Sequence, residues 1–94
     1  MDDDVAPFEG KLEFVAGADM WAVAPTGDWA EDNRTGSKYA GQIIKYIQDD
    51  HHRLPLLGHI LREMVRKARF GAIEVGFSHR IAVEFLAASR SARP

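Results

Sequence analysis

The chain has 94 residues, of which 46% are hydrophobic and 28% are charged, a composition typical of one globular domain. It has no cysteine, which excludes a disulfide framework, a thiolate metal site and a cysteine nucleophile. No apolar stretch approaches the roughly 18–20 residues that a membrane-spanning helix needs, and the acidic start does not resemble a signal peptide. We therefore expect a soluble, cytoplasmic protein.

The two halves of the chain differ in charge, although the net charge of the whole is only −2. Residues 1–50 carry eleven acidic and four basic side chains, whereas residues 51–94 carry three acidic and eight basic ones. Such an asymmetry marks either a surface that faces a partner or pairing between the two halves within the molecule. We expect mainly ordinary solvated surface, together with some internal pairing.

The two ends of the chain are expected to lie outside the folded domain. The first ten residues contain three consecutive aspartates, which repel one another, and a proline and a glycine that disfavour regular structure. The last residues are basic and short of apolar side chains. We expect a flexible acidic arm over residues 1–10, a single globular domain over residues 11–89 and a frayed basic tail over residues 90–94.

Residues 11–24 combine an alternating apolar pattern with a turn signal. Leu12 and Phe14 alternate with charged neighbours, Gly17 begins a turn, and Trp21 lies in a second apolar run. Alternation with a period of two is typical of strands. We predict a short antiparallel hairpin over residues 11–24, and the alternative is an irregular apolar segment that lies across the core.

A helix is predicted over residues 29–49. Asp28 and Glu31 have the spacing of a capping box, with Asp28 in place of the usual serine or threonine. Gly36 lies on the apolar stripe of this helix, one turn before Ala40, which indicates that another element crosses closely there. The alternative is a break at Thr35-Gly36. The apolar stripe consists of Trp29, Gly36, Ala40, Ile43 and Ile47, with Tyr39 and Tyr46 beside it.

A second helix is predicted over residues 55–69. Pro55 suits the first helical position, where its missing N–H is harmless, and Gly71 suits the position just after the helix. Three arginines, Arg62, Arg66 and Arg69, form a stripe opposite the apolar arc. The apolar arc consists of Leu57, Ile60, Leu61, Met64, Val65 and Ala68.

The remaining segment is predicted to form a strand and then a third helix. Ile73, Val75 and Phe77 alternate, whereas the residues after Ser78 are good helix formers. We therefore predict a strand over 72–77 and a helix over 79–89, and the alternative is a second hairpin that turns near Gly76. Together these elements predict an α+β domain with a short antiparallel sheet, packed by three helices.

Catalytic and metal-binding chemistry has little support in the sequence. Carboxylates and imidazoles cluster between the first two helices, but adjacent side chains point in different directions and rarely bind one ion together. No serine lies in a nucleophile elbow. Glu74 becomes a buried acid only if both faces of the predicted sheet are covered, and is otherwise solvated or paired with an arginine. We expect no enzymatic activity, no metal, no cofactor and no small-molecule substrate. The clustered residues are Asp49, Asp50, His51, His52 and His59.

Two kinds of macromolecular binding remain. The arginine stripe of the second helix could follow a phosphate backbone, although the isoelectric point of about 6.0 argues against a nucleic-acid partner. Nine aromatic residues are many for a small core, and exposed tryptophan and tyrosine are favoured at protein interfaces. We predict a protein-interaction module that self-associates as a homodimer, with nucleic-acid binding as the alternative. The predicted contact residues are Arg62, Arg66, Arg69, Tyr39, Tyr46 and Trp21.

Overall fold

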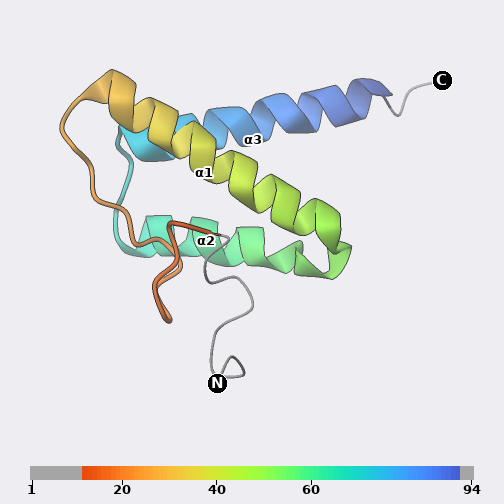
Figure 1. Cartoon of the computed structure of the whole chain (residues 1–94), viewed down its shortest axis with the longest axis horizontal. Coiled ribbons are helices and arrows are strands. Elements are labelled where there is room, and N and C mark those ends of the chain that lie inside the picture. The colour runs from red at the N-terminus through yellow and green to blue at the C-terminus, as the bar shows by residue number, and fades with distance from the viewer. Residues whose placement is uncertain (1–11, 92–94) are drawn as a thin grey trace.

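The computed structural model describes residues 12–91, which form a short segment without regular structure followed by three α-helices (Figure 1). The helices are α1 (Trp29–Asp49), α2 (Pro55–Arg66) and α3 (Ala72–Ser91), and a 3-10 turn, η2 (His51–Arg53), joins α1 to α2. Within the described residues there is no β-strand, so the predicted α+β class is wrong. The predicted acidic arm, and the tail from residue 92, lie outside the described residues.

Helix α1 has the predicted bounds, because its ends are set by local chemistry. Asp28 caps the first turn by accepting a hydrogen bond from the backbone N–H of Glu31 at 3.0 Å. At the other end Asp50 leaves the helix in an extended conformation, and no basic side chain lies in the last turn. The helix is continuous through Thr35 and Gly36, so the alternative of a break there is wrong.

Helix α2 begins at the predicted Pro55 but ends at Arg66, three residues before the predicted end. The chain leaves it through a Schellman motif, in which the N–H of Arg69 binds the carbonyl of Met64 and the N–H of Ala68 binds that of Val65. Ala68 takes the left-handed position that was expected of Gly71, with a φ of 53°. Arg69 is therefore not a helical residue.

Helix α3 replaces both the predicted strand over 72–77 and the shorter helix over 79–89. Gly71 lies just before the helix, and the Glu74 carboxylate accepts a 2.7 Å hydrogen bond from the backbone N–H of Gly71, which is half of a capping box. The Gly71 carbonyl also accepts a hydrogen bond from the N–H of Val75, four residues later. The backbone hydrogen bonding is therefore already helical where a strand was predicted. The helix continues through Arg90 to Ser91, two positions that were expected to fray.

The segment before α1 reverses direction where a hairpin was predicted, but it pairs too little to form strands. Ala16 and Asp19 exchange two backbone hydrogen bonds around Gly17, which adopts a positive φ of 59°. One further bond joins Ala22 to Phe14, and no ladder follows. The predicted turn is thus present, whereas the predicted hairpin over 11–24 is wrong within residues 12–24. The segment instead lies across the core as an irregular apolar stretch.

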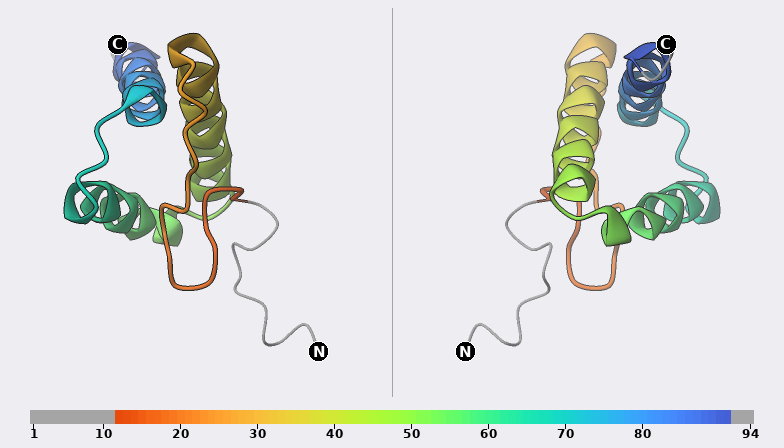
Figure 2. Two further views of the ribbon diagram at one scale, coloured as in Figure 1. Left: turned by 90° about the vertical axis from the view of Figure 1, so that its left-hand side faces the viewer. Right: turned by 90° about the vertical axis from the view of Figure 1, so that its right-hand side faces the viewer.

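Helices α1 and α3 cross so closely that two glycines meet the opposite backbone. A Cβ on Gly36 would overlap the carbonyl oxygen of Ile73, and one on Gly76 would overlap that of Asn33. Only glycine lets two helices approach to this distance. The predicted close crossing at Gly36 is confirmed. Beyond it the two helices diverge toward their C-terminal ends, while α2 runs back beneath them (Figure 1) and stands apart from α3 (Figure 2).

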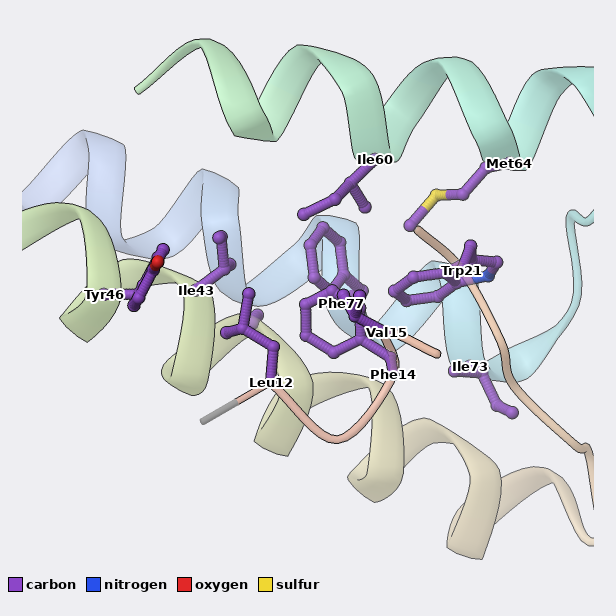
Figure 3. Packing of buried hydrophobic residues seen from close by; sticks show 11 residues of the cluster. Leu12, Phe14, Val15, Trp21, Ile43, Tyr46, Ile60, Met64, Ile73 and Phe77 are labelled. Carbon is purple, nitrogen blue, oxygen red and sulfur yellow. The ribbon is translucent and has the colours of Figure 1, made fainter. Parts of the chain in front are cut away.

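The core lies between the α1–α3 crossing and α2, and the segment before α1 fills it (Figure 3). Phe14, Trp21 and Phe77 form an aromatic cluster with ring centroids 5.0–6.0 Å apart. Ile60 and Met64 of α2 pack on this cluster from the other side. The irregular segment therefore supplies the apolar surface that holds α2 in place.

Candidate interaction surface

The aromatic residues that were predicted to meet a partner are mostly used inside the molecule. Trp21 is 1% exposed, and its indole N–H donates a 2.7 Å hydrogen bond to Glu74. Tyr39 is half-buried against Phe14 and Trp21, and Tyr46 is buried with the Arg53 guanidinium 3.9 Å from its ring centre. Trp29, which the sequence places on the apolar stripe of the first helix, is exposed instead.

The three predicted arginines are exposed but do not form one continuous cationic face. Glu63 binds Arg66 through two hydrogen bonds of 3.0 and 2.7 Å, which lower the pKa of the Glu63 carboxyl and raise the pKa of the Arg66 guanidinium. Arg69 lies past the end of α2, so only Arg62 and Arg66 keep the helical spacing. Much of the charge that a phosphate backbone would meet is therefore neutralised or displaced.

Neighbouring charges join the two halves of the chain. Lys67 donates to the Asp19 carboxylate and to the Trp21 carbonyl, and the hydrogen bond from Lys67 lowers the pKa of Asp19. This pair accounts for part of the charge asymmetry as internal pairing, as the sequence indicated.

The carboxylates and imidazoles after α1 do not converge. The Asp50 carboxylate accepts hydrogen bonds from the backbone and the ring of His52, which lower the pKa of Asp50. His51 and His59 are exposed, and no group of three or more potential ligands forms within residues 12–91. Glu74 is buried, which was one of the two possibilities that the sequence left open. It lies in the first turn of a helix, however, rather than in a covered sheet, and it binds Trp21 and Gly71.

The most unusual surface of the described chain is α3. Its inner face, with Ile73 and Phe77, is buried, yet its remaining circumference is also largely apolar. Phe85 is 70% exposed, Leu86 is 55% exposed and Val75 is 44% exposed. A helix that is apolar all round is normally covered on all sides. Among the described residues, only one side of α3 is covered by other parts of the chain.

The exposed residues of α3 have a regular spacing that sequence inspection missed. Five exposed positions recur at intervals of three and four residues on the side opposite the core face, and we call them the α3 seam. The period-two pattern that suggested a strand hid this spacing, since both patterns include Val75. The α3 seam consists of Val75, Ser78, Ala82, Phe85 and Ser89.

An apolar cleft opens beside the seam, where α1 and α3 diverge. It has a volume of about 390 Å³, and Phe85 belongs to both the cleft and the seam. The start of α2 closes the third side with Leu54 and Leu57. The exposed apolar surface of α3 is thus continuous with a hollow, whose lining also includes the polar side chains of Gln48 and Glu84. The other apolar side chains that line the cleft are Ile44, Ile47, Ile81, Ala87 and Ala88.

Comparison with protein-family models, curated proteins and solved structures finds no match for this chain. Within residues 12–91, no helix has both the length and the apolar character required to cross a membrane.

Proposed function

We propose that this chain is a small protein-interaction module that acts by self-association, with the outer face of α3 as its contact surface. The observation that carries the proposal is the exposure of Phe85, Leu86 and Val75 together on one helix. Scattered exposed apolar residues are ordinary, but a contiguous apolar face on a folded domain is typical of an interface. The proposal involves no catalytic step, metal or cofactor.

Domain size supports the same proposal. A domain of this length buries only about 60–65% of the surface of its unfolded chain, and association is one way in which small domains gain further burial. Burying Phe85 and Leu86 would add about 2 kcal/mol for each side chain, before the cost of association. The surface of α3 offers this gain without any rearrangement of the core.

The proposal is tested by sedimentation equilibrium of the full chain and two variants. Phe85→Glu places a charge in the seam, and we expect it to lower the apparent mass toward the 10.5 kDa of one chain. Val65→Glu is the matched control, because Val65 is 67% exposed on α2 and lies outside the seam. Equal masses for wild type and both variants would contradict the proposal, provided that circular dichroism shows the same helix content in all three.

Nucleic-acid binding through Arg62 and Arg66 stays a prediction and takes second place. A mobility-shift titration at low and high salt tests it, because phosphate contacts by arginine depend strongly on ionic strength. A mobility shift at low salt that charge reversal at Arg62 abolishes would favour nucleic-acid binding through the arginines over self-association through α3.

A further inference from the structure

The segment before α1 packs between α2 and the crossing of α1 and α3, and we call residues 12–27 the strap. Among the described residues, no hydrogen bond or ion pair joins α2 to α1 or to α3. The two buried side chains of α2, Ile60 and Met64, instead face the aromatic cluster, to which the strap contributes Phe14 and Trp21 (Figure 3). Without the strap, α2 would lose much of the surface on which it packs.

Two contacts fasten the middle of the strap to α3 and to the end of α2. The indole N–H of Trp21 donates a 2.7 Å hydrogen bond to the carboxylate of Glu74, which is buried in the first turn of α3. Lys67, the residue that follows α2, donates to the carboxylate of Asp19 and, at 2.9 Å, to the Trp21 carbonyl. Trp21 is therefore tied through its side chain to α3 and through its backbone to the end of α2.

Two further contacts fasten the ends of the strap to α1. Lys38 and Gln42 donate to the carboxylate of Glu13 at 3.1 and 2.6 Å. Thr26 donates its backbone N–H and its hydroxyl to the buried carboxylate of Asp32 at 3.0 and 2.8 Å. A carboxylate is thus the acceptor at each of these four contacts, and the strap supplies two of the carboxylates while the helices supply the other two.

The crossing of α1 and α3 is held in a different way. The backbones meet at Gly36 and Gly76, and buried apolar side chains such as Ile43 and Phe77 pack beside them. No hydrogen bond or ion pair between described residues joins these two helices, and the ion pairs within α1 and within α3 each stay in one helix. Protonation of carboxylates therefore removes contacts of the strap but none that holds the crossing.

The cations around the strap favour ionised carboxylates at neutral pH. The hydrogen bond from Lys67 lowers the pKa of Asp19, and the more distant charge of Arg66 acts in the same direction. The hydrogen bond from Lys38 likewise lowers the pKa of Glu13.

The other two carboxylates are buried and accept hydrogen bonds from neutral donors. The hydrogen bonds from the backbone just before α1 lower the pKa of Asp32. Glu74 accepts from an indole and a backbone N–H, and His79 lines the same shallow cleft. The acidic neighbour of the strap is Glu63 on α2, which lies within electrostatic reach of Asp19 as a like charge.

The depressed pKa values determine the pH range in which these contacts act. Their stabilisation is complete above the unfolded values of about 3.9 for Asp and about 4.3 for Glu, and it is lost as pH falls through the lower folded values. A protonated carboxyl is also a weaker acceptor, since charge-assisted hydrogen bonds are roughly twice as strong as neutral ones. Acid below about pH 4 therefore weakens the contacts of the strap together.

From this contrast we infer that the strap is an acid-sensitive fastening: protonation of its carboxylate contacts releases residues 12–27 together with α2, while the crossing of α1 and α3 stays closed. Release opens the side of the α1–α3 pair that the aromatic cluster now covers. The inference does not depend on the proposed self-association, because none of the four contacts involves the outer face of α3.

Acidification of the full chain carrying Trp29→Phe tests the order of release. Trp29 is 62% exposed, and its replacement leaves Trp21 as the single tryptophan. We expect acrylamide quenching of Trp21 to rise severalfold while the far-UV circular dichroism keeps most of its helical signal. About three quarters should remain, because α2 has 12 helical residues against 21 in α1 and 20 in α3, and a free helix as short as α2 is marginal in water.

Hydrogen exchange followed by mass spectrometry locates the change along the chain. As pH falls, we expect peptides of the strap and of α2 to lose protection together with the burial of Trp21, while peptides that contain Gly36 and Gly76 keep theirs. Loss of protection at the crossing at the same pH as in α2 would overturn the inference. A Trp21 side chain that stays buried until all the helices unfold would overturn it as well.

Two variants in the same background test the role of the carboxylates. Asp19→Asn removes the charge that Lys67 meets but keeps an oxygen for the backbone N–H of Trp21. We expect release of Trp21 to begin at a higher pH in this variant, because one ionised contact is already absent at neutral pH. Glu84→Gln is the matched control, since Glu84 forms its ion pair within α3. An unchanged release pH for Asp19→Asn, or an equal change for both variants, would contradict fastening by carboxylates.

Discussion

At the scale of single residues, the carboxylate of Glu74 joins three separate parts of the chain. One oxygen accepts the indole N–H of Trp21 from the segment before α1, and the other accepts the backbone N–H of Gly71 between α2 and α3. Both bonds are 2.7 Å long, and the side chain is buried. Glu74 therefore fixes the start of α3 and the position of Trp21 at the same time.

Replacing Glu74 by Gln should destabilise the fold by about 2 kcal/mol, because the amide NH2 would face a donor and leave a buried group unsatisfied. Urea unfolding followed by tryptophan fluorescence measures the change. Glu84→Gln is the control, since the Glu84–Arg80 pair is half-exposed and 3.6 Å long and should contribute less than about 1 kcal/mol. Equal losses for the two variants would show that the Trp21 and Gly71 contacts add nothing.

Asp32 gives the fold a dependence on acid pH. The backbone N–H of Thr26 donates to its carboxylate at 3.0 Å, and the Thr26 hydroxyl and the Gly27 N–H donate as well, which lowers the pKa of Asp32. These donors lie just before α1. Their hydrogen bonds to the ionised carboxylate therefore hold the segment that leads into α1 against the first turns of the helix.

Because the folded-state pKa is depressed, the stabilisation from Asp32 is complete above the unfolded aspartate pKa of about 3.9 and is lost as pH falls through the folded value. We expect Asp32→Asn to be less stable than wild type at neutral pH and to show a shallower loss of stability below about pH 4. Thermal melts between neutral and acid pH compare the two proteins. Parallel curves over that whole range would contradict this role.

At the scale of secondary-structure elements, the closest contact is the crossing of α1 and α3 at Gly36 and Gly76. The backbones approach too closely for a Cβ at either position. The crossing fixes the point from which the two helices diverge, and so it also determines where the cleft beside Phe85 begins.

Gly76→Ala should destabilise the chain by about 3 kcal/mol, because the new methyl group would overlap the carbonyl oxygen of Asn33 and push the helices apart. Gly58→Ala is the matched control on α2, where a Cβ meets nothing within 4 Å. We expect that control to gain up to about 1 kcal/mol from helix propensity. A stabilised Gly76→Ala variant would show that the two helices do not touch there.

Elements whose ends depend on local chemistry could be predicted from the sequence. Asp28 signalled the start of α1 and Pro55 the start of α2, and both predictions are confirmed. The strand predicted over 72–77 failed because the apolar residues of this region fit two patterns. Ile73, Phe77 and Ile81 are every second member of the alternating positions, and because they are four residues apart they also lie on one face of a helix. Val75 alone distinguishes the two, and it is exposed.

Features that depend on contacts between distant residues could not be read from the sequence. The left-handed Ala68 ends α2 where no glycine marked it, and the Lys67–Asp19 pair joins residues 48 positions apart. Of the predicted contact residues, the arginines are on the surface, whereas Trp21 is in the core. The apolar outer face of α3 was missed because a helix without a strong polar side shows little helical periodicity.

At the scale of the whole molecule, the three helices enclose their core unequally. The α1–α3 crossing, the segment before α1 and the inner face of α2 are packed together, while the outer face of α3 has no covering element among the described residues (Figure 2). If the chain self-associates as proposed, stability and association depend on different faces of α3. Substitutions on the α3 seam should change the mass of the assembly with little effect on the fold of each chain.

The central claim, self-association, is tested most directly by the light-scattering mass of the unmodified full chain, measured over a wide range of concentrations. The proposal predicts a mass that rises to twice the 10.5 kDa of one chain and goes no further, because an isologous contact closes at two copies. A mass that stays at 10.5 kDa up to the highest concentration would contradict it.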